Sequence, residues 1–168
     1  MATATLNYGA KTTITISLAS VAASSSLIAG QESNEVDNTT NKFLDALVQG
    51  KVKTGASGVA AGSLVVYVWG SDTSAATTAL DVIDGADSTE TITSAGIRDA
   101  LFRRGAVVAI EAANSRTYNI APFSVAALFG GALPKYWGLF VTHSSTATLS
   151  STASDHEFTY TGVKYDVA

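Results

Sequence analysis

Two histidines are the residues of this sequence best suited to acid–base or metal chemistry near neutral pH. His143 is followed by two serines, and His156 lies between Asp155 and Glu157. A catalytic histidine needs an oriented partner and a nucleophile nearby. On a strand, Asp155 and Glu157 share one face and His156 takes the other, so the three side chains do not converge. We therefore predict a polar strand entry at 155–157 and a surface position for His143.

The carboxylates and glycines do not form a recognisable catalytic or ligand-binding motif. A glycosidase needs two carboxylates across a cleft, and no spacing here favours such a pair. The acidic stretch 81–87 lacks the alternating oxygen ligands and final Glu of a calcium loop, and 55–58 lacks the Lys-Ser/Thr of a phosphate loop. We expect no catalytic residue, no cofactor, no metal ligand and no enzyme activity. A hydrolase on a β-sandwich is the enzymatic alternative that stays open.

Three aromatic residues are candidates for binding. Trp69 ends an apolar run, and Tyr136 and Trp137 begin another. Such side chains stack on sugar rings in carbohydrate-binding sandwiches, but packing in a core or between subunits is their commoner use. We expect Trp69, Tyr136 and Trp137 to make core or inter-subunit contacts, with a sugar platform as the alternative.

Composition limits the class of protein. The chain has 168 residues, of which 46% are hydrophobic and 14% charged, with a formal net charge of −4 and no cysteine. A disordered chain would be richer in charge, and a helical bundle would be richer in Glu, Lys and Leu than in Thr, Val, Ser and Gly. The only dense basic spot is Arg103-Arg104, so no nucleic-acid partner is expected. No stretch reaches 18 apolar residues, so no membrane partner is expected either.

The elements that must position these residues are short strands. Strands are predicted where apolar and hydroxyl side chains alternate, or where an apolar run lies between turns. The clearest segments are 12–18, 64–69, 106–112, 136–143 and 157–167. Residues 43–48 fit a helix or a strand, and the alternation that continues to Val52 favours the strand. Residues 123–129 predict one short helix after Pro122.

This pattern predicts an all-β fold, a β-sandwich of jelly-roll type with at most one short helix. No change of composition marks a boundary within residues 12–168, which we interpret as one domain. Residues 1–11 contain few large apolar side chains and predict an extended N-terminal arm. Leu6, Tyr8 and Lys11 of this arm are candidate inter-subunit contacts, because extended termini can pair with a neighbour's sheet edge.

Three stretches resemble one family of proteins. They are Glu35-Val36-Asp37-Asn38-Thr39-Thr40-Asn41-Lys42-Phe43-Leu44-Asp45-Ala46-Leu47-Val48, then Pro122-Phe123-Ser124-Val125-Ala126 with Leu133-Pro134-Lys135-Tyr136-Trp137-Gly138, and Phe158-Thr159-Tyr160-Thr161-Gly162-Val163. In order and content they resemble small structural proteins of tailed bacteriophages that decorate or cement the capsid. The resemblance implies a non-enzymatic β-sandwich that binds the major capsid protein, often as a homotrimer, and carries over no catalytic residue.

On this resemblance we expect a virion protein of the capsid surface that is synthesised in the host cytoplasm. A tail or baseplate subunit is a close alternative, and a carbohydrate-binding, receptor-binding virion module is a second one. The low charge fits a protein that packs closely against neighbours, because few unpaired ions would be buried. We also expect that deletion of residues 1–11 lowers particle stability and occupancy.

Overall fold

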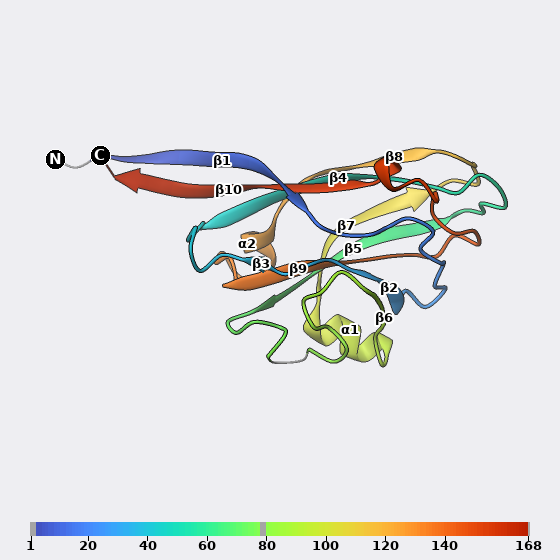
Figure 1. Cartoon of the computed structure of the whole chain (residues 1–168), viewed down its shortest axis with the longest axis horizontal. Helices are drawn as coiled ribbons and strands as arrows, with labels where there is room; N and C mark the ends of the chain where they lie inside the picture. Colours follow the sequence, from blue (N-terminus) through green and yellow to red (C-terminus); the bar gives the residue numbers. More distant parts are fainter. Residues whose placement is uncertain (1–2, 78–79, 168) are drawn as a thin grey trace.

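The chain forms two antiparallel β-sheets that face each other (Figure 1). The computed structural model describes residues 3–77 and 80–167. Sheet A has the strand order β1-β10-β4-β8, and sheet B has the order β6-β2-β9-β5-β7, with β3 paired to β9. The elements are β1 (Ala4–Ile14), β2 (Ala29–Glu32), β3 (Val36–Asp37), β4 (Asp45–Lys53), β5 (Gly62–Ser71), β6 (Thr89–Thr91), α1 (Ala95–Leu101), β7 (Arg103–Ile110), β8 (Thr117–Ser124), α2 (Val125–Leu128), β9 (Tyr136–His143), the 3₁₀ turn η1 (Ala153–Asp155) and β10 (Glu157–Val167). The expected all-β, sandwich-like fold is confirmed.

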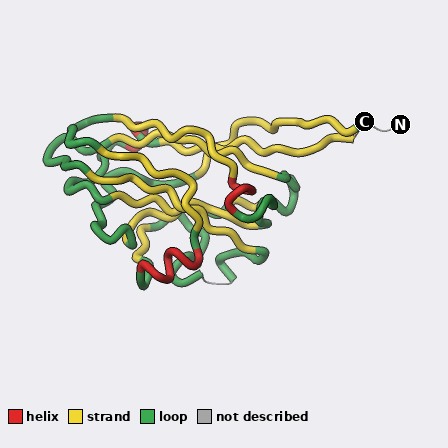
Figure 2. The backbone as a smooth tube through the Cα atoms, turned by 180° about the vertical axis from the view of Figure 1, so that it is seen from behind, coloured by secondary structure: helices red, strands yellow, loops and turns green. Residues whose placement is uncertain are grey.

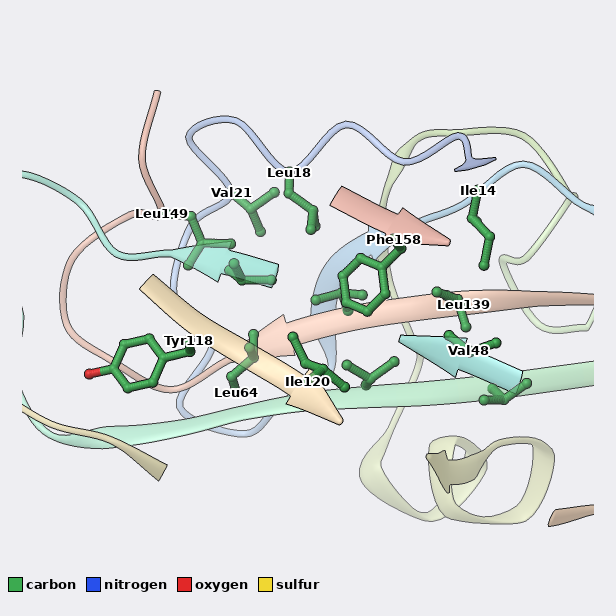
Figure 3. Close-up of a cluster of buried hydrophobic side chains, with 14 of the residues drawn as sticks. Ile14, Leu18, Val21, Val48, Leu64, Tyr118, Ile120, Leu139, Leu149 and Phe158 are labelled. Carbon is green, nitrogen blue, oxygen red and sulfur yellow. The ribbon is translucent and has the colours of Figure 1, made fainter. Parts of the chain in front are cut away.

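The main core lies between the two sheets, where alternate side chains of the facing strands meet (Figure 3). Val48 of β4 and Phe158 of β10 come from sheet A, and Leu64 of β5 and Leu139 of β9 come from sheet B. The strand interpretation of 43–48 is confirmed over β4, because Val48 and Val52 both face this core. Each fully buried side chain of this size contributes about 1.5–3 kcal/mol to the free energy of unfolding.

A third layer covers the outer face of sheet B, on the side away from sheet A (Figure 1). It consists of residues 72–77, 80–88 and 92–102, which include α1 but not the sheet B strand β6, and it forms a second buried cluster with sheet B. Phe102 packs in this layer against Tyr67 of β5 and Phe140 of β9, with ring centroids 6.4 and 5.7 Å away. This layer explains why residues 64–69 are apolar on both faces: the strand is buried from both sides.

Two short helices lie in different parts of the molecule: α1 belongs to the third layer, and α2 follows β8 and contacts β4 and β7. Helix α1 corresponds to no helix predicted from the sequence; the Ser94 hydroxyl caps it by accepting from the Ile97 N–H. The helix predicted at 123–129 is the single turn α2, capped by Ser124. Pro122 belongs to β8 rather than to the helix, because the chain stays extended up to Ser124.

Strands β1 and β10 form a ribbon that continues past the rest of the molecule (Figures 1 and 2). The first residues, expected to form an extended arm, are extended and are paired with the end of the same chain, Ala4 opposite Val167 and Ile14 opposite Phe158. The pairing shifts by one residue between Tyr8 and Lys11, where the ribbon leaves the sandwich. Ala4 and Val167 therefore lie together at the tip of this ribbon.

Candidate functional site

The prediction of a surface position for His143 is wrong, because this side chain is fully buried at the end of β9. Its Nδ1 lies 2.8 Å from the Ser145 hydroxyl, and its Nε2 lies 3.1 Å from the Val21 carbonyl oxygen. Burial lowers the pKa of His143 below its usual value, against the opposing effect of the Val21 carbonyl. The ring is therefore a neutral structural group that joins two loops to the core.

The Asp155-His156-Glu157 sequence forms no converging cluster. Glu157 forms an ion pair with Lys11 across the β1–β10 pair, at 3.1 Å. Asp155 accepts from Lys53 instead, and the Ser150 hydroxyl and Lys53 together lower the pKa of Asp155. The three residues hold the start of β10 in place. Within residues 3–77 and 80–167, no group of three or more His, Cys, Asp or Glu side chains is placed to hold a metal ion.

Several carboxylates attach the third layer to the sandwich. Glu32, fully buried on β2, accepts from the backbone N–H groups of Asp84 and Gly85. Glu35 accepts from the N–H of Ala75 at 2.7 Å, and Asp87 accepts from the Gln31 amide at 2.7 Å. Because their oxygens accept from the protein's own donors, these three carboxylates serve the fold.

Glu32 predicts a pH dependence of stability. Burial raises the pKa of Glu32 from 4.5 to about 7, although the Gly85 and Asp84 N–H groups oppose the shift. Between these values the folded chain holds a proton that the unfolded chain lacks, so this contribution is complete below pH 4.5 and is lost as the pH rises through about 7. The free energy of unfolding should fall by on the order of 3 kcal/mol at most over this pH range. The denaturant midpoint should therefore be lower at pH 8 than at pH 5 in the natural chain, and this fall should be absent in Glu32→Gln, which mimics the protonated acid.

His143 gives the free energy of unfolding the opposite dependence on pH. The same measurement on the Glu32→Gln chain separates the two contributions. Its lowered pKa means that its contribution is present above the unfolded value of 6.5 and is lost as the pH falls. Removing Glu32 should therefore leave a chain whose stability falls toward acid. A Glu32→Gln chain that loses as much stability between pH 5 and pH 8 as the natural chain would contradict this account of Glu32.

The structure corrects the expectation for the two tryptophans. Trp69 and Trp137 are both fully buried, so neither is available to a partner subunit or a sugar. Trp137 faces the main core and meets the Tyr160 ring edge-on at 5.4 Å, while Trp69 lies under the third layer. Tyr136 is half-buried at the start of β9. The core alternative is therefore correct for both tryptophans, and the sugar platform has no support from them.

Three exposed apolar side chains lie together on the projecting part of the ribbon, whereas Leu44 and Val107 are exposed elsewhere. Leu6 is 46% exposed, and Tyr8 and Tyr165 are each 58% exposed. Leu6 stands opposite Tyr165, and Tyr8 stands opposite Val163, so these four share one face of the ribbon. Their exposure is notable because apolar side chains on a two-stranded ribbon have no second sheet to cover them. We call this face the apolar ribbon face.

The opposite face of the ribbon is polar. Asn7 stands opposite Lys164, and the Asn7 amide donates to Asp166 at 2.6 Å. Lys164 also forms an ion pair with Asp166 at 3.1 Å. The ribbon is thus amphipathic: one face is apolar, and the other presents charged and amide groups to water.

Phe43 fixes the ribbon where it leaves the sandwich. A Cβ placed on Gly162 would lie 2.4 Å from the Phe43 ring, and one on Gly9 would lie 3.3 Å from it. The absence of side chains at these glycines lets the aromatic ring lie directly on the backbone of both strands. The direction of the ribbon is therefore set by packing and does not depend on its own two strands alone.

A shallow groove lies on the outer face of sheet A, next to the ribbon. It has a volume of about 450 Å³ and is lined by Lys11, Gln49, Gly50, Lys51, Asn119, Ile120, Ala121, Pro122, Glu157 and Thr159. Among the predicted contacts, Lys11 belongs to the groove, while Leu6 and Tyr8 belong to the apolar ribbon face. Tyr165 is not among the contacts predicted from the sequence, although Val163 and Tyr165 show the same period-two pattern as Leu6 and Tyr8.

Comparisons with known proteins add no family. No family model and no curated protein matches this sequence. In the described part of the chain, no helix has the length and apolar character needed to cross a membrane.

Proposed function

We propose that this chain is a non-enzymatic structural subunit of a tailed-phage virion that binds the shell of the major capsid protein and stabilises it. The sequence resemblance to capsid decoration proteins suggests this role. The position on the capsid surface and the assembly as a homo-oligomer belong to the same proposal. What supports it beyond the resemblance is the strand order and the character of the exposed surface.

The strand order supports assignment of the sandwich to the jelly-roll type. Strand pairs are nested along the chain: β1 pairs with β10, β2 with β9, β4 with β8, and β5 with β7. Such nesting places the pairs alternately in the two sheets, as in an eight-stranded jelly roll with short extra strands β3 and β6. Jelly rolls occur in viral capsid and lectin domains and in cupins, so the fold is compatible with a virion role without specifying it.

The observation that carries the proposal is a contrast between two kinds of side chain: polar groups that are hydrogen-bonded within the fold, and apolar groups that are exposed on its surface. Glu32, Asp87 and His143 are bonded within the fold, whereas Leu6, Tyr8 and Tyr165 face solvent. Exposed apolar side chains on a projecting element are typical of interaction sites. This arrangement favours a molecule that acts by binding another protein surface.

Binding to capsid shells tests the proposal. Purified chain added to heads that lack it should bind in a saturable manner and raise the temperature at which the heads dissociate. Cryo-electron microscopy of the complex should place density for the chain on the head. Density confined to the tail would overturn the decoration role and favour the tail or baseplate alternative.

The extended first residues provide a second test on the same particles. A chain that lacks residues 1–11 should show lower occupancy and give less thermal protection. Circular dichroism checks that the shortened chain keeps its β-structure. Unchanged occupancy and protection with an intact fold would show that these residues make no inter-subunit contact in the particle.

A further inference from the structure

The apolar ribbon face is continuous with the outer face of sheet A. Phe158 and Tyr160 of β10 point into the main core, so Thr159, Thr161 and the residues two and four positions beyond point outward. The same alternation brings Val163 and Tyr165 to the outer side. The groove and the apolar ribbon face therefore lie on one side of one sheet.

This face differs from the outer face of sheet B because none of the described residues forms a layer over it. Sheet B lies between sheet A and the third layer, whereas among the described residues the outer face of sheet A carries only the short turn η1 beside β4 (Figure 1). The groove combines apolar groups from Ala121 and Pro122 with the polar ends of Gln49 and Asn119. A tyrosine side chain would satisfy both kinds of neighbour, because it has an apolar ring and a polar tip.

The size of the face indicates how much a partner must cover. Strand β10 has 11 residues and thus a length of about 36 Å, and four strands are about 19 Å wide. The ribbon alone offers a few large side chains, which is too little for a stable interface of about 800 Å² per partner. The ribbon and the groove together offer a larger surface than either alone, so one occupant should cover both.

The charge distribution favours a second copy of this chain as that occupant. Residues 54–97 contain no lysine or arginine, and their acidic residues are Asp72, Asp81, Asp84, Asp87 and Glu90. These five account for more than the whole net charge of −4; four of them lie between β5 and β6, and Glu90 lies on β6 at the edge of sheet B. On the outer face of sheet A, Lys11 is paired with Glu157, and Lys51 lies beside them. Two identical copies can meet through this mixed-sign face, whereas their third layers would repel each other.

We propose that two copies of the chain pack through the outer faces of sheet A, with the apolar ribbon face of each copy lying in the groove of the other. The ribbon and the groove of one copy lie on the same face. The ribbon of one copy can therefore reach the groove of the other only when the two faces oppose each other. A two-fold axis provides this opposition and forms the contact twice. The geometry thus favours a two-fold pair over the three-fold ring that the resemblance implies. The inference does not depend on the virion role.

The oligomeric state of the full chain tests this proposal. Sedimentation velocity at micromolar concentration should give the mass of two natural chains, and Tyr8→Lys with Tyr165→Lys should weaken association at least tenfold. Val107→Lys is the matched control, because Val107 is also 58% exposed but lies on β7 of sheet B. A monomeric natural chain, or a ribbon variant that associates as the natural chain does, would overturn the proposal.

Site-directed cross-linking tests the position of the ribbon. The chain contains no cysteine, so single replacements report one position each. A mixture of Tyr165→Cys and Ala121→Cys chains should form a mixed disulfide, which needs Cα atoms about 4.4–6.8 Å apart. Tyr165→Cys mixed with Val107→Cys should not. Cross-linking to Val107→Cys alone would overturn the proposed packing.

Head binding distinguishes the two proposals. If the natural chain is monomeric and the ribbon variant no longer binds heads, the ribbon's partner is the shell; this inference then fails and the proposed function stands. If the chain forms the two-fold pair but binds no head, the proposed function fails and this inference stands.

Discussion

Replacing Gly138 with alanine should lower the free energy of unfolding by about 2–3 kcal/mol, a large share of the stability of a domain this size. A Cβ at this position would lie 2.5 Å from Cζ2 and 2.6 Å from Cε2 of Trp69. Trp69 stands opposite Gly138 on the neighbouring strand and is fully buried, so its indole cannot move aside without disturbing the third layer. Chemical denaturation, followed by tryptophan fluorescence, measures the change.

Gly96→Ala is the matched control for this substitution. Gly96 lies in the first turn of α1, and the nearest atom to an added Cβ is the Ser94 hydroxyl oxygen at 3.8 Å. With no clash, alanine should stabilise the chain by about 0.5–1 kcal/mol through its higher helix propensity. If Gly138→Ala unfolded at the same denaturant concentration as the natural chain, Trp69 could not be seated on Gly138 as described.

The predictable part of the fold is the part that depends on neighbouring residues. Alternation along a strand is a local property, so the strands that contain Val48, Val66 and Phe158 could be located from sequence. The same holds for the two-sheet, all-β class, because short strands with an apolar face must pack in pairs of layers. Their bounds shifted by a few residues, as at Pro122, which extends β8 instead of starting a helix.

The third layer could not be predicted, because its causes are contacts between distant residues. Helix α1 has only seven residues, too few for a clear period of 3.6. It is held by tertiary contacts: Arg98 donates to the Ser26 and Leu27 carbonyl oxygens and lies 5.2 Å from the Tyr67 ring centroid. The burial of Trp69 follows from this layer, which is why a residue at the end of an apolar run looked available to a partner.

The candidate site was predictable in part for a related reason. Leu6, Tyr8 and Lys11 were singled out as contacts because of their place in an extended terminus, and they lie on the ribbon and in the groove. Tyr165 was not singled out, because only the pairing of β1 with β10 brings it beside Leu6. A face built from both ends of a chain is not visible in either end alone.

Two aromatic residues of β10 allow the core and the surface of one strand to be compared. Phe158→Ala should destabilise the chain by about 3–5 kcal/mol, because a fully buried ring between the sheets would be replaced by a cavity. The loss includes the contact of the ring with Gly50, where an added Cβ would lie 2.6 Å from the Phe158 ring. Denaturant unfolding at low protein concentration measures this loss without a contribution from association.

Tyr165→Ala is the surface counterpart of Phe158→Ala. We expect Phe158→Ala to weaken the fold itself and Tyr165→Ala to weaken the association of chains. At low protein concentration this variant should unfold within about 0.5 kcal/mol of the natural chain, because the side chain is 58% exposed. At high concentration the natural chain should gain stability as copies associate, and the variant should gain less. If Tyr165→Ala destabilised the chain at low concentration as much as Phe158→Ala does, Tyr165 would be a core residue and the apolar ribbon face would not be available for binding. If Tyr165→Ala is less stable than the natural chain only at high protein concentration, Tyr165 acts in the contact between chains. A side chain that supports only its own fold would change the stability equally at every concentration.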